Sequence, residues 1–413
     1  MVEEKFIFTA SAKRKTFILS GVGLVLLILG LICVSLFSHP SGENAASHIH
    51  NAGAIWYTRL LTNIWLNNML FTGIAVIALF FIAFNYLSWA GWVVTFKRVP
   101  EAIGSFLPII GVITLVVFFI FHKVIFHWSA DVVSDEIAEK SGYLNMGFFT
   151  FRTIAYYLIW GLFWYFLRKN SLKEDLTGEL KWYDQSIVLS GGFIFIFGIT
   201  SSTAAWDWVM SIDAYHFSTM FGWYVFASWF ILGLAVISLF VVYLKENGYL
   251  KEVNANHIHD LGKYMFAFSI FWTYIWFAQF LLTYYSNLPE EAVYYVARLK
   301  SDIYRPFFYF NICVNFLIPF LGLMTRDAKR QHLFIKIVCF CIIIGHWCDF
   351  YLMMAPPLLG TNGGMDLWFF LVELGTTLLY TGIFLYVVLT SLTKAGLVPK
   401  HHPMLEESIH HQA

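Results

Sequence analysis

The sequence predicts an all-α integral membrane protein with ten transmembrane helices. Of its 413 residues, 59% are hydrophobic and only 13% are charged, whereas soluble domains are about 45–50% apolar and about 25% charged. The apolar residues collect in runs of about 18–25, the length that crosses about 30 Å of hydrocarbon. The segments between the runs are short and leave no room for a soluble catalytic domain. We therefore expect one membrane domain covering residues 1–413.

The ten runs follow one another with no linker or low-complexity tract between them. The first is long enough to span and lacks a small-residue cleavage site, so we interpret it as an anchor. Pro108 lies inside the third run, which makes the boundaries of that run the least defined. In chain order, the predicted spans are 17–37, 70–89, 106–126, 147–167, 187–205, 220–244, 264–285, 307–324, 333–354 and 367–390.

The distribution of Lys and Arg predicts the direction of these spans. If the N-terminus is cytoplasmic, the inner segments carry 19 of the 26 Lys and Arg residues and the outer segments carry six, with Arg152 inside a span. Cytoplasmic segments of membrane proteins are enriched in these residues. Both termini are therefore expected on the cytoplasmic side.

Charged residues recur at equivalent places in the two halves of the chain. Arg152 opens the fourth span and Arg305 precedes the eighth, while Asp207 closes the fifth and Asp349 lies in the ninth. In each case the second residue comes four spans later in the same direction. This pattern indicates two repeats related by an axis along the membrane normal. We expect four-helix bundles at 69–208 and 220–354, with peripheral helices at 17–37 and 367–390.

The cost of a buried charge suggests partners for these residues. A guanidinium or carboxylate at membrane depth must face protein, water or a counter-ion. We therefore expect Arg152 to pair with Asp207, and Arg305 with Asp349. Each pair could also serve only to hold helices together, and this interpretation stays open.

Six ionisable residues are candidates for a proton path or a quinol site. His346 and Asp349 are three residues apart and share a helix face, and a His beside an Asp can titrate near neutral pH. A carboxylate inside the tenth span is costly unless it has a function or a partner. A satisfied structural pair is the competing interpretation for His346 and Asp349. The candidates are Asp207, Asp213, His216, His346, Asp349 and Glu373.

The sequence predicts no redox cofactor and no metal in this chain. A transmembrane b-haem needs two histidines at matching depth, and of the 14 His only His346 lies well inside a span. No CxxCH motif is present for a c-type haem, and no nucleotide-binding fingerprint appears. The five Cys are not clustered, as iron–sulfur and structural zinc sites require.

Two segments carry a resemblance to a known family. TSSTAAWDWVMSIDAYHFSTMFGWYVFASW at 200–229 and RPFFYFNICVNFLIPFLGLMTRDAKR at 305–330 resemble the NrfD-like membrane subunits of the polysulfide reductase family. Within that family, the chain is most similar to the second such subunit of bacterial alternative complex III. The resemblance covers essentially the whole chain, and the stretch from WDWVMS to STMFGWY is its most specific part.

The resemblance implies a subunit of a bacterial inner-membrane quinol:electron-acceptor oxidoreductase. Expected partners are a homologous NrfD-like subunit, an iron–sulfur subunit, multihaem cytochrome c subunits and lipids, but no nucleic acid. Those partners would carry the haem c and the iron–sulfur clusters. Binding of a quinone such as menaquinone by this chain itself stays an open alternative. The family places quinol or proton chemistry at outer-side polar positions that match five of the candidates: Asp207, Asp213, His216, His346 and Asp349.

A stand-alone secondary transporter is the alternative from another functional class. Internal repeats and intramembrane charges also occur in such proteins. Against this alternative, the sequence predicts no span with a Gly/Pro-broken midpoint, since Pro108 and Pro319 lie near span ends.

Overall fold

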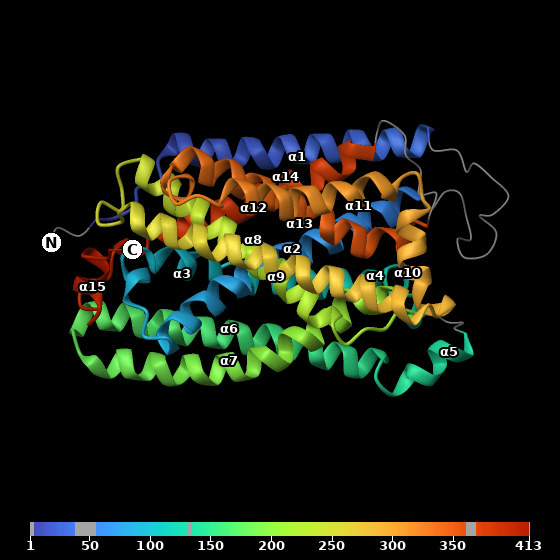
Figure 1. The fold of residues 1–413 in the computed structure, drawn as a ribbon, viewed down its shortest axis with the longest axis horizontal. Helices are drawn as coiled ribbons and strands as arrows, with labels where there is room; N and C mark the ends of the chain where they lie inside the picture. The colour runs from blue at the N-terminus through green and yellow to red at the C-terminus, as the bar shows by residue number, and fades with distance from the viewer. Residues whose placement is uncertain (1–3, 38–54, 131–133, 361–368, 413) are drawn as a thin grey trace.

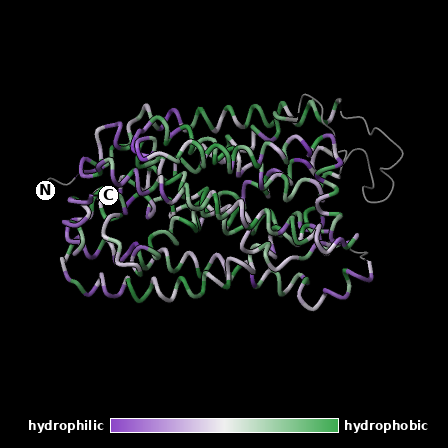
Figure 2. Tube along the Cα trace, in the orientation of Figure 1, coloured by the Kyte–Doolittle hydropathy of each residue, from purple (hydrophilic) through white to green (hydrophobic). Residues whose placement is uncertain are grey.

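The protein is a bundle of long helices that run along its longest axis. The computed structural model describes residues 4–37, 55–130, 134–360 and 369–412, and this part contains helices but no β-strand. Both termini lie at the same end of the bundle (Figure 1). Hydrophilic residues gather at the two ends of the long axis and hydrophobic residues fill the middle (Figure 2). This is the pattern of an all-α membrane protein.

Eight helices in the described residues are long and apolar enough to cross a membrane. The break between α3 and α4 falls within one of these eight segments, which runs from Arg98 to Ile125. The eight are α1 (Ala10–Phe37), α2 (Ile55–Leu87), α3 (Arg98–Gly104) with α4 (Leu107–Ile125), α7 (Leu180–Trp208), α8 (Phe221–Glu246), α9 (Ala255–Ser286), α13 (His332–Leu359) and α14 (Phe369–Leu392).

Two further predicted spans correspond to helices of a different character. The fourth predicted span lies in α6 (Met146–Thr177), which is as long as the others but richer in charged residues. The eighth lies in α11 (Tyr304–Ile312) and α12 (Ile318–Gly322), which a π-helical turn over Cys313–Leu317 separates. Shorter helices complete the fold: η2 (Gly91–Phe96), η3 (His127–Ser129), α5 (Asp135–Ala138), η4 (Glu139–Gly142), η5 (Met210–Ile212), α10 (Pro289–Leu299), η7 (Ala328–Arg330) and α15 (Leu405–Ile409).

α1 and α14 form a closely packed pair. A Cβ atom on Gly375 would lie 2.4 Å from the backbone nitrogen of Leu27, and one on Gly23 would lie 2.5 Å from that of Leu379. Glycines at such a contact let two membrane helices approach closely. Much of the remaining surface of α1 is exposed and apolar. The predicted tenth span began at residue 367, but residues 367 and 368 lie outside the described part.

α2 is the central helix and is longer than the sequence predicted. It contacts α1, α3, α4, α7, α8, α13 and α14. The predicted span began at residue 70 and left Asn63, Asn67 and Asn68 outside it. Those amides are fully or almost fully buried inside the bundle, so the helix extends back to Ile55. This prediction was wrong because polar residues of a helix surrounded by protein need not face water.

α2 and α8 interlock through two glycines on opposite helices. The indole of Trp229 on α8 lies over Gly73 of α2, where a Cβ would come within 1.9 Å of its Cδ1. The indole Nε1 donates to the backbone oxygen of Met69 at 3.1 Å. One turn further, Ile77 of α2 fits against Gly233 of α8, where a Cβ would meet Ile77 Cγ2 at 2.4 Å.

Gly73→Ala should destabilise the protein because the added methyl group collides with the Trp229 indole. Overpacking of a dense core costs about 1–3 kcal/mol. Gly198→Ala is the matched control, since Gly198 of α7 has no atom within 4 Å of a built Cβ. Thermal unfolding in detergent should show a lower midpoint for Gly73→Ala only. Equal midpoints would contradict this account of the α2–α8 contact.

Candidate functional site

A buried carboxylate, Asp349 of α13, collects hydrogen bonds from three other helices. Its oxygens accept from Tyr224 and Ser228 of α8, from Trp272 of α9 and from Asn311 of α11. The distances are 2.8 Å from Ser228 Oγ, 3.2 Å from Trp272 Nε1 and 2.8 Å from Asn311 Nδ2. Asp349 has no exposed surface, and these four donors are all neutral. The arrangement stabilises a carboxylate without a hydrogen-bonded cation.

His346 lies one turn before Asp349, as the spacing predicted. Its Nδ1 is 3.7 Å from Asp349 Oδ2, and the ring has no exposed surface. Neither ring nitrogen has a hydrogen-bond partner among the described residues. The ring packs edge-on against Trp272, with centroids 5.5 Å apart. His346 and Asp349 are therefore buried neighbours with no hydrogen bond between them.

The break between α11 and α12 lies beside this carboxylate. Pro319 has no N–H to bond the carbonyl of Asn315, and the chain forms its π-helical turn over Cys313–Leu317 immediately before it. Asn315 Nδ2 donates to Asn311 Oδ1 at 2.6 Å, and Gly345 leaves room for the Asn315 amide against α13. The sequence predicted no span with a broken midpoint, but the π-helical turn over Cys313–Leu317 lies at the middle of the eighth predicted span, 307–324. The proline that follows the turn lies nearer the span end and did not indicate a break at the midpoint. Such turns are frequent at functional sites.

The predicted pair of Arg305 and Asp349 does not form. Arg305 lies at the start of α11 with its side chain half exposed, and its NH2 donates to Asp302 Oδ1 at 2.8 Å. The carboxylate of Asp302 is 90% exposed. The matching order of charges in the two halves of the chain suggested this pair. Arg305 instead faces the surface of the bundle, whereas Asp349 faces its interior. Asn311, two turns further along α11, donates to Asp349 instead.

The other predicted pair, Arg152 and Asp207, is joined by two hydrogen bonds. Arg152 Nε and NH2 lie 2.7 and 2.8 Å from the two carboxylate oxygens. Tyr156 Oη donates to Asp207 Oδ2 at 2.8 Å, and the guanidinium lies 3.9 Å from the centroid of the Tyr143 ring. Asp207 is fully buried, so the guanidinium supplies the counter-charge that the carboxylate needs.

Glu373 forms a second buried ion pair, between α14 and α2. Its Oε1 accepts from Arg59 Nε at 2.9 Å and from Asn63 Nδ2 at 3.1 Å. Glu373 lies in the second turn of α14, nearer a helix end than the prediction assumed. Among the described residues, the hydrogen bonds of this pair and those of Asp349 share no side chain. The two buried carboxylates therefore belong to separate polar groups.

Asp213 and His216 lie in the turn between α7 and α8. His216 stacks on Tyr294 of α10, with ring centroids 4.2 Å apart. Burial, together with the charges of Arg298 and Lys140, lowers the pKa of His216 to about 3. The imidazole is therefore neutral near pH 7, and its Nε2 is buried without a hydrogen-bond partner among the described residues. Asp213 is partly exposed in the same turn.

Arg298 of α10 compensates for two prolines in α13. Pro356 and Pro357 lie inside this helix and lack the N–H groups that would bond the carbonyls of Leu352 and Met353. Arg298 Nε donates to Leu352 O at 2.8 Å, and its NH2 donates to Met353 O at 3.2 Å. One buried guanidinium thus replaces two missing backbone donors, which allows α13 to continue to Leu359.

Sequence reasoning missed a buried ionic cluster at the end of the bundle that carries the termini. Glu101 accepts from Arg98 NH1 at 2.8 Å, from Arg168 and from Ser171 Oγ at 2.6 Å. Lys97 Nζ is 3.7 Å from Glu174 Oε2, and Arg98 also pairs with Asp175. These cations counted only as inner surface charges in the sequence. Glu101, an acidic residue just before the third predicted span, was the available signal. The ionic cluster comprises Lys97, Arg98, Glu101, Arg168, Glu174 and Asp175.

No protein-family model matches the chain, and a search of curated proteins finds no match. Within the described residues, no three His, Cys, Asp or Glu side chains are arranged to hold a metal ion. The geometry of the buried polar groups is therefore the basis for a functional proposal.

Arg298→Met should destabilise the protein because it leaves the carbonyls of Leu352 and Met353 buried and unpaired. Each such group costs about 1–3 kcal/mol, so we expect a loss of about 2–6 kcal/mol for the two carbonyls. Arg305→Met, which removes a half-exposed surface guanidinium, should change stability by less than about 0.5 kcal/mol. Denaturation in detergent measures both. Comparable stability of the two variants would show that Arg298 does not support α13.

Proposed function

We propose that this chain is a membrane subunit of a bacterial respiratory quinol:electron-acceptor oxidoreductase of the alternative complex III type. Its role would be to hold neighbouring subunits and to conduct protons, with quinol binding as a further role of the same polar groups. The sequence resemblance of the 200–229 and 305–330 segments supports the family. The buried carboxylates support the role in proton movement.

The proposal includes ten spans arranged as two four-helix bundles with two peripheral helices. α6 and α11–α12 would cross the membrane together with the eight apolar segments. Helix contacts favour this grouping, since α2, α4, α6 and α7 contact one another in a closed cycle. A second cycle joins α8, α9, α12 and α13. Both termini lie at one end (Figure 1), as an even number of crossings requires, and the Lys and Arg distribution makes that end cytoplasmic.

Asp349 with His346 is the single observation that carries the proton role. Ionisable residues inside membrane spans are costly and mark proton or ion pathways. Asp207 is compensated by Arg152, whereas the donors to Asp349 are neutral. Protonation of Asp349 therefore removes a charge that has no salt-bridged Arg or Lys beside it. We infer that Asp349 can take up and release a proton with His346 as its neighbour.

A row of buried polar side chains along α2 supports a second route for protons, which starts at Glu373. Asn63 joins Glu373 to the backbone of Arg59, and Asn67 Nδ2 donates to Asn63 O at 2.8 Å. One turn further, Tyr157 Oη bonds both Thr72 and Thr114, at 2.8 and 3.0 Å. These groups extend the polar environment of Glu373 inward from its end of the bundle.

Partner subunits would supply the redox chemistry. In this proposal a homologous membrane subunit, an iron–sulfur subunit and multihaem cytochrome c subunits surround the chain in the inner membrane. Haem c and iron–sulfur clusters would reside in those partners, and a quinone such as menaquinone could approach the outer-side polar residues. Exposed apolar surface on α1, α6, α7 and α9 is available to lipids and to these partners.

A secondary transporter is the second candidate, and one observation favours it. Broken helices at buried polar sites are typical of transporter binding sites. Here the π-helical turn between α11 and α12 places Asn311 against Asp349 and Asn315 against Asn311. Purification distinguishes the two candidates. Co-purification of c-type haem and an iron–sulfur subunit with a tagged chain supports the respiratory complex, and a colourless, partner-free protein supports the transporter.

Asp349→Asn and Glu373→Gln should slow quinol oxidation or uncouple it from proton movement, because an amide cannot exchange a proton. Loss of a proton-transfer group costs about 10²–10⁴-fold in rate, so a decrease of at least about tenfold is expected in an assembled complex. Turnover and proton release are measured in proteoliposomes.

Asp302→Asn is the matched control, because the Asp302 carboxylate is 90% exposed. It should leave both rates unchanged. Full turnover with unchanged proton stoichiometry in both Asp349→Asn and Glu373→Gln would remove the proton-path proposal.

A further inference from the structure

The C-terminal segment 396–412, here called the strap, crosses the end of the bundle that carries the termini. It begins beside the N-terminal segment, where Leu397 N donates to Glu4 O at 2.9 Å. Lys400 N then donates to Asp175 Oδ1 at 3.0 Å, which ties the strap to the ionic cluster. Further along, Ser408 Oγ donates to Trp92 O at 2.9 Å. The strap thus covers the region above the ionic cluster before it reaches α9.

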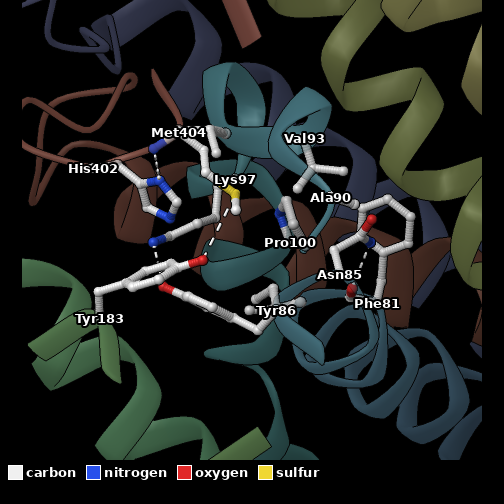
Figure 3. A pocket seen from close by; sticks show the side chains of 12 residues that line it. Phe81, Asn85, Tyr86, Ala90, Val93, Lys97, Pro100, Tyr183, His402 and Met404 are labelled. Carbon is white, nitrogen blue, oxygen red and sulfur yellow. Dashed lines mark hydrogen bonds between the residues drawn. The ribbon is translucent and has the colours of Figure 1, made fainter. Parts of the chain in front are cut away.

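His402 is the strap residue that enters the protein. It is only 6% exposed, and its ring lies 5.2 Å from Tyr183 and 6.0 Å from Tyr86 between centroids. Figure 3 shows His402 and Lys97 in the same narrow pocket, which both residues help to line. His402 Nδ1 accepts from the backbone N–H of Met404 at 3.3 Å. An acceptor at Nδ1 requires a neutral imidazole.

The charges around His402 are those of the ionic cluster and of the strap itself. Lys97 faces the ring from the segment between η2 and α3, and Arg98 and Glu101 of α3 come next. Glu174 of α6 lies beyond Lys97, 3.7 Å from its Nζ. Tyr86 from α2 and Tyr183 from α7 complete the surroundings. The remaining titratable residues of this part of the strap are Lys400, His401, Glu406 and Glu407.

The far end of the strap is held by a separate set of contacts at α9. His411 Nε2 lies 2.9 Å from Asp260 Oδ2 of α9. Its backbone oxygen accepts from Asn254 and Asn256 at 3.0 and 3.1 Å. His257 and Lys263 also face this site, with the His257 ring 5.2 Å from that of His411 and Lys263 Nζ 2.7 Å from Asp260.

We propose that the strap is a pH-sensitive cover, which opens at His402 in acid while its far end stays attached at Asp260. Opening would expose Lys97 and the carboxylates of the ionic cluster to water on the side of the membrane where the termini lie. A proton on His402 removes the bond that Nδ1 accepts from Met404 and places a second positive charge near Lys97. The amide bonds from Asn254 and Asn256 to the backbone oxygen of His411 do not titrate, so the far end keeps these contacts. This inference does not depend on the proposed function.

The direction of the pH effect follows from the His402 environment. Burial lowers the pKa of docked His402 to about 2, from 6.5 for a free ring, and Lys97 contributes to this shift. A group with a lowered pKa stabilises the docked state fully above the free pKa, and this stabilisation is lost as pH falls below it. The opening equilibrium should therefore rise about tenfold between about pH 7.5 and about pH 5.5.

Hydrogen–deuterium exchange of the full chain in lipid nanodiscs tests the cover. After correction for the intrinsic pH dependence of exchange, amides of residues 400–405 should lose about tenfold in protection between about pH 7.5 and about pH 5.5. Amides of residues 408–411 should keep their protection in the same sample. His402→Gln and His402→Phe should abolish the pH response, because neither side chain titrates.

His410→Gln is the control variant. Its side chain is 79% exposed and lies 3.7 Å from Glu406, so the variant should keep the full response. Unchanged protection of residues 400–405 in the wild-type chain overturns the proposal. An equal loss of protection at residues 408–411 also overturns it. A tenfold change in the protection of residues 400–405 that survives in either His402 variant does so as well.

Discussion

The need to satisfy polar groups away from water governs this structure. A membrane core offers no hydrogen bonds, so each buried polar group needs a partner from the protein. Asp349 meets this need with four neutral donors from three neighbouring helices. Asp207 meets it with one guanidinium and one hydroxyl. These bonds fix which helix faces meet, so the polar groups specify the arrangement of an otherwise uniformly apolar bundle.

The same constraint explains the irregular backbone. Pro356 and Pro357 would leave two carbonyls of α13 unpaired, and Arg298 reaches across from α10 to bond both. Pro319 follows a π-helical turn whose Asn315 joins the Asp349 group through Asn311. Arg298 supplies the donors that Pro356 and Pro357 lack, and the π-helical turn lies beside the Asn311 that donates to Asp349. These two irregularities therefore lie beside buried polar side chains, and the proposed proton chemistry lies at the π-helical turn.

The two ends of the bundle differ in how they balance charge. At the end with the termini, three cations and three carboxylates form one buried cluster beneath the strap. At the other end, the charges are balanced in separate ion pairs, such as Arg59 with Glu373 and Arg152 with Asp207. In such a shared cluster, the ionisable groups titrate together and can share a single proton. An isolated pair has no such alternative, because removing one partner leaves an uncompensated buried charge.

The sequence by itself determined the helical membrane class and the approximate position of each long helix, because apolar length is a local property. It also predicted the partners Arg152 and Asp207 and the neighbours His346 and Asp349. It misplaced the start of α2 and the partner of Arg305, and it missed the ionic cluster. Those features depend on which residues face protein, since Asn63 or Glu101 reads as surface until another helix covers it. Only the packing of the helices decided where each polar side chain finds its partner.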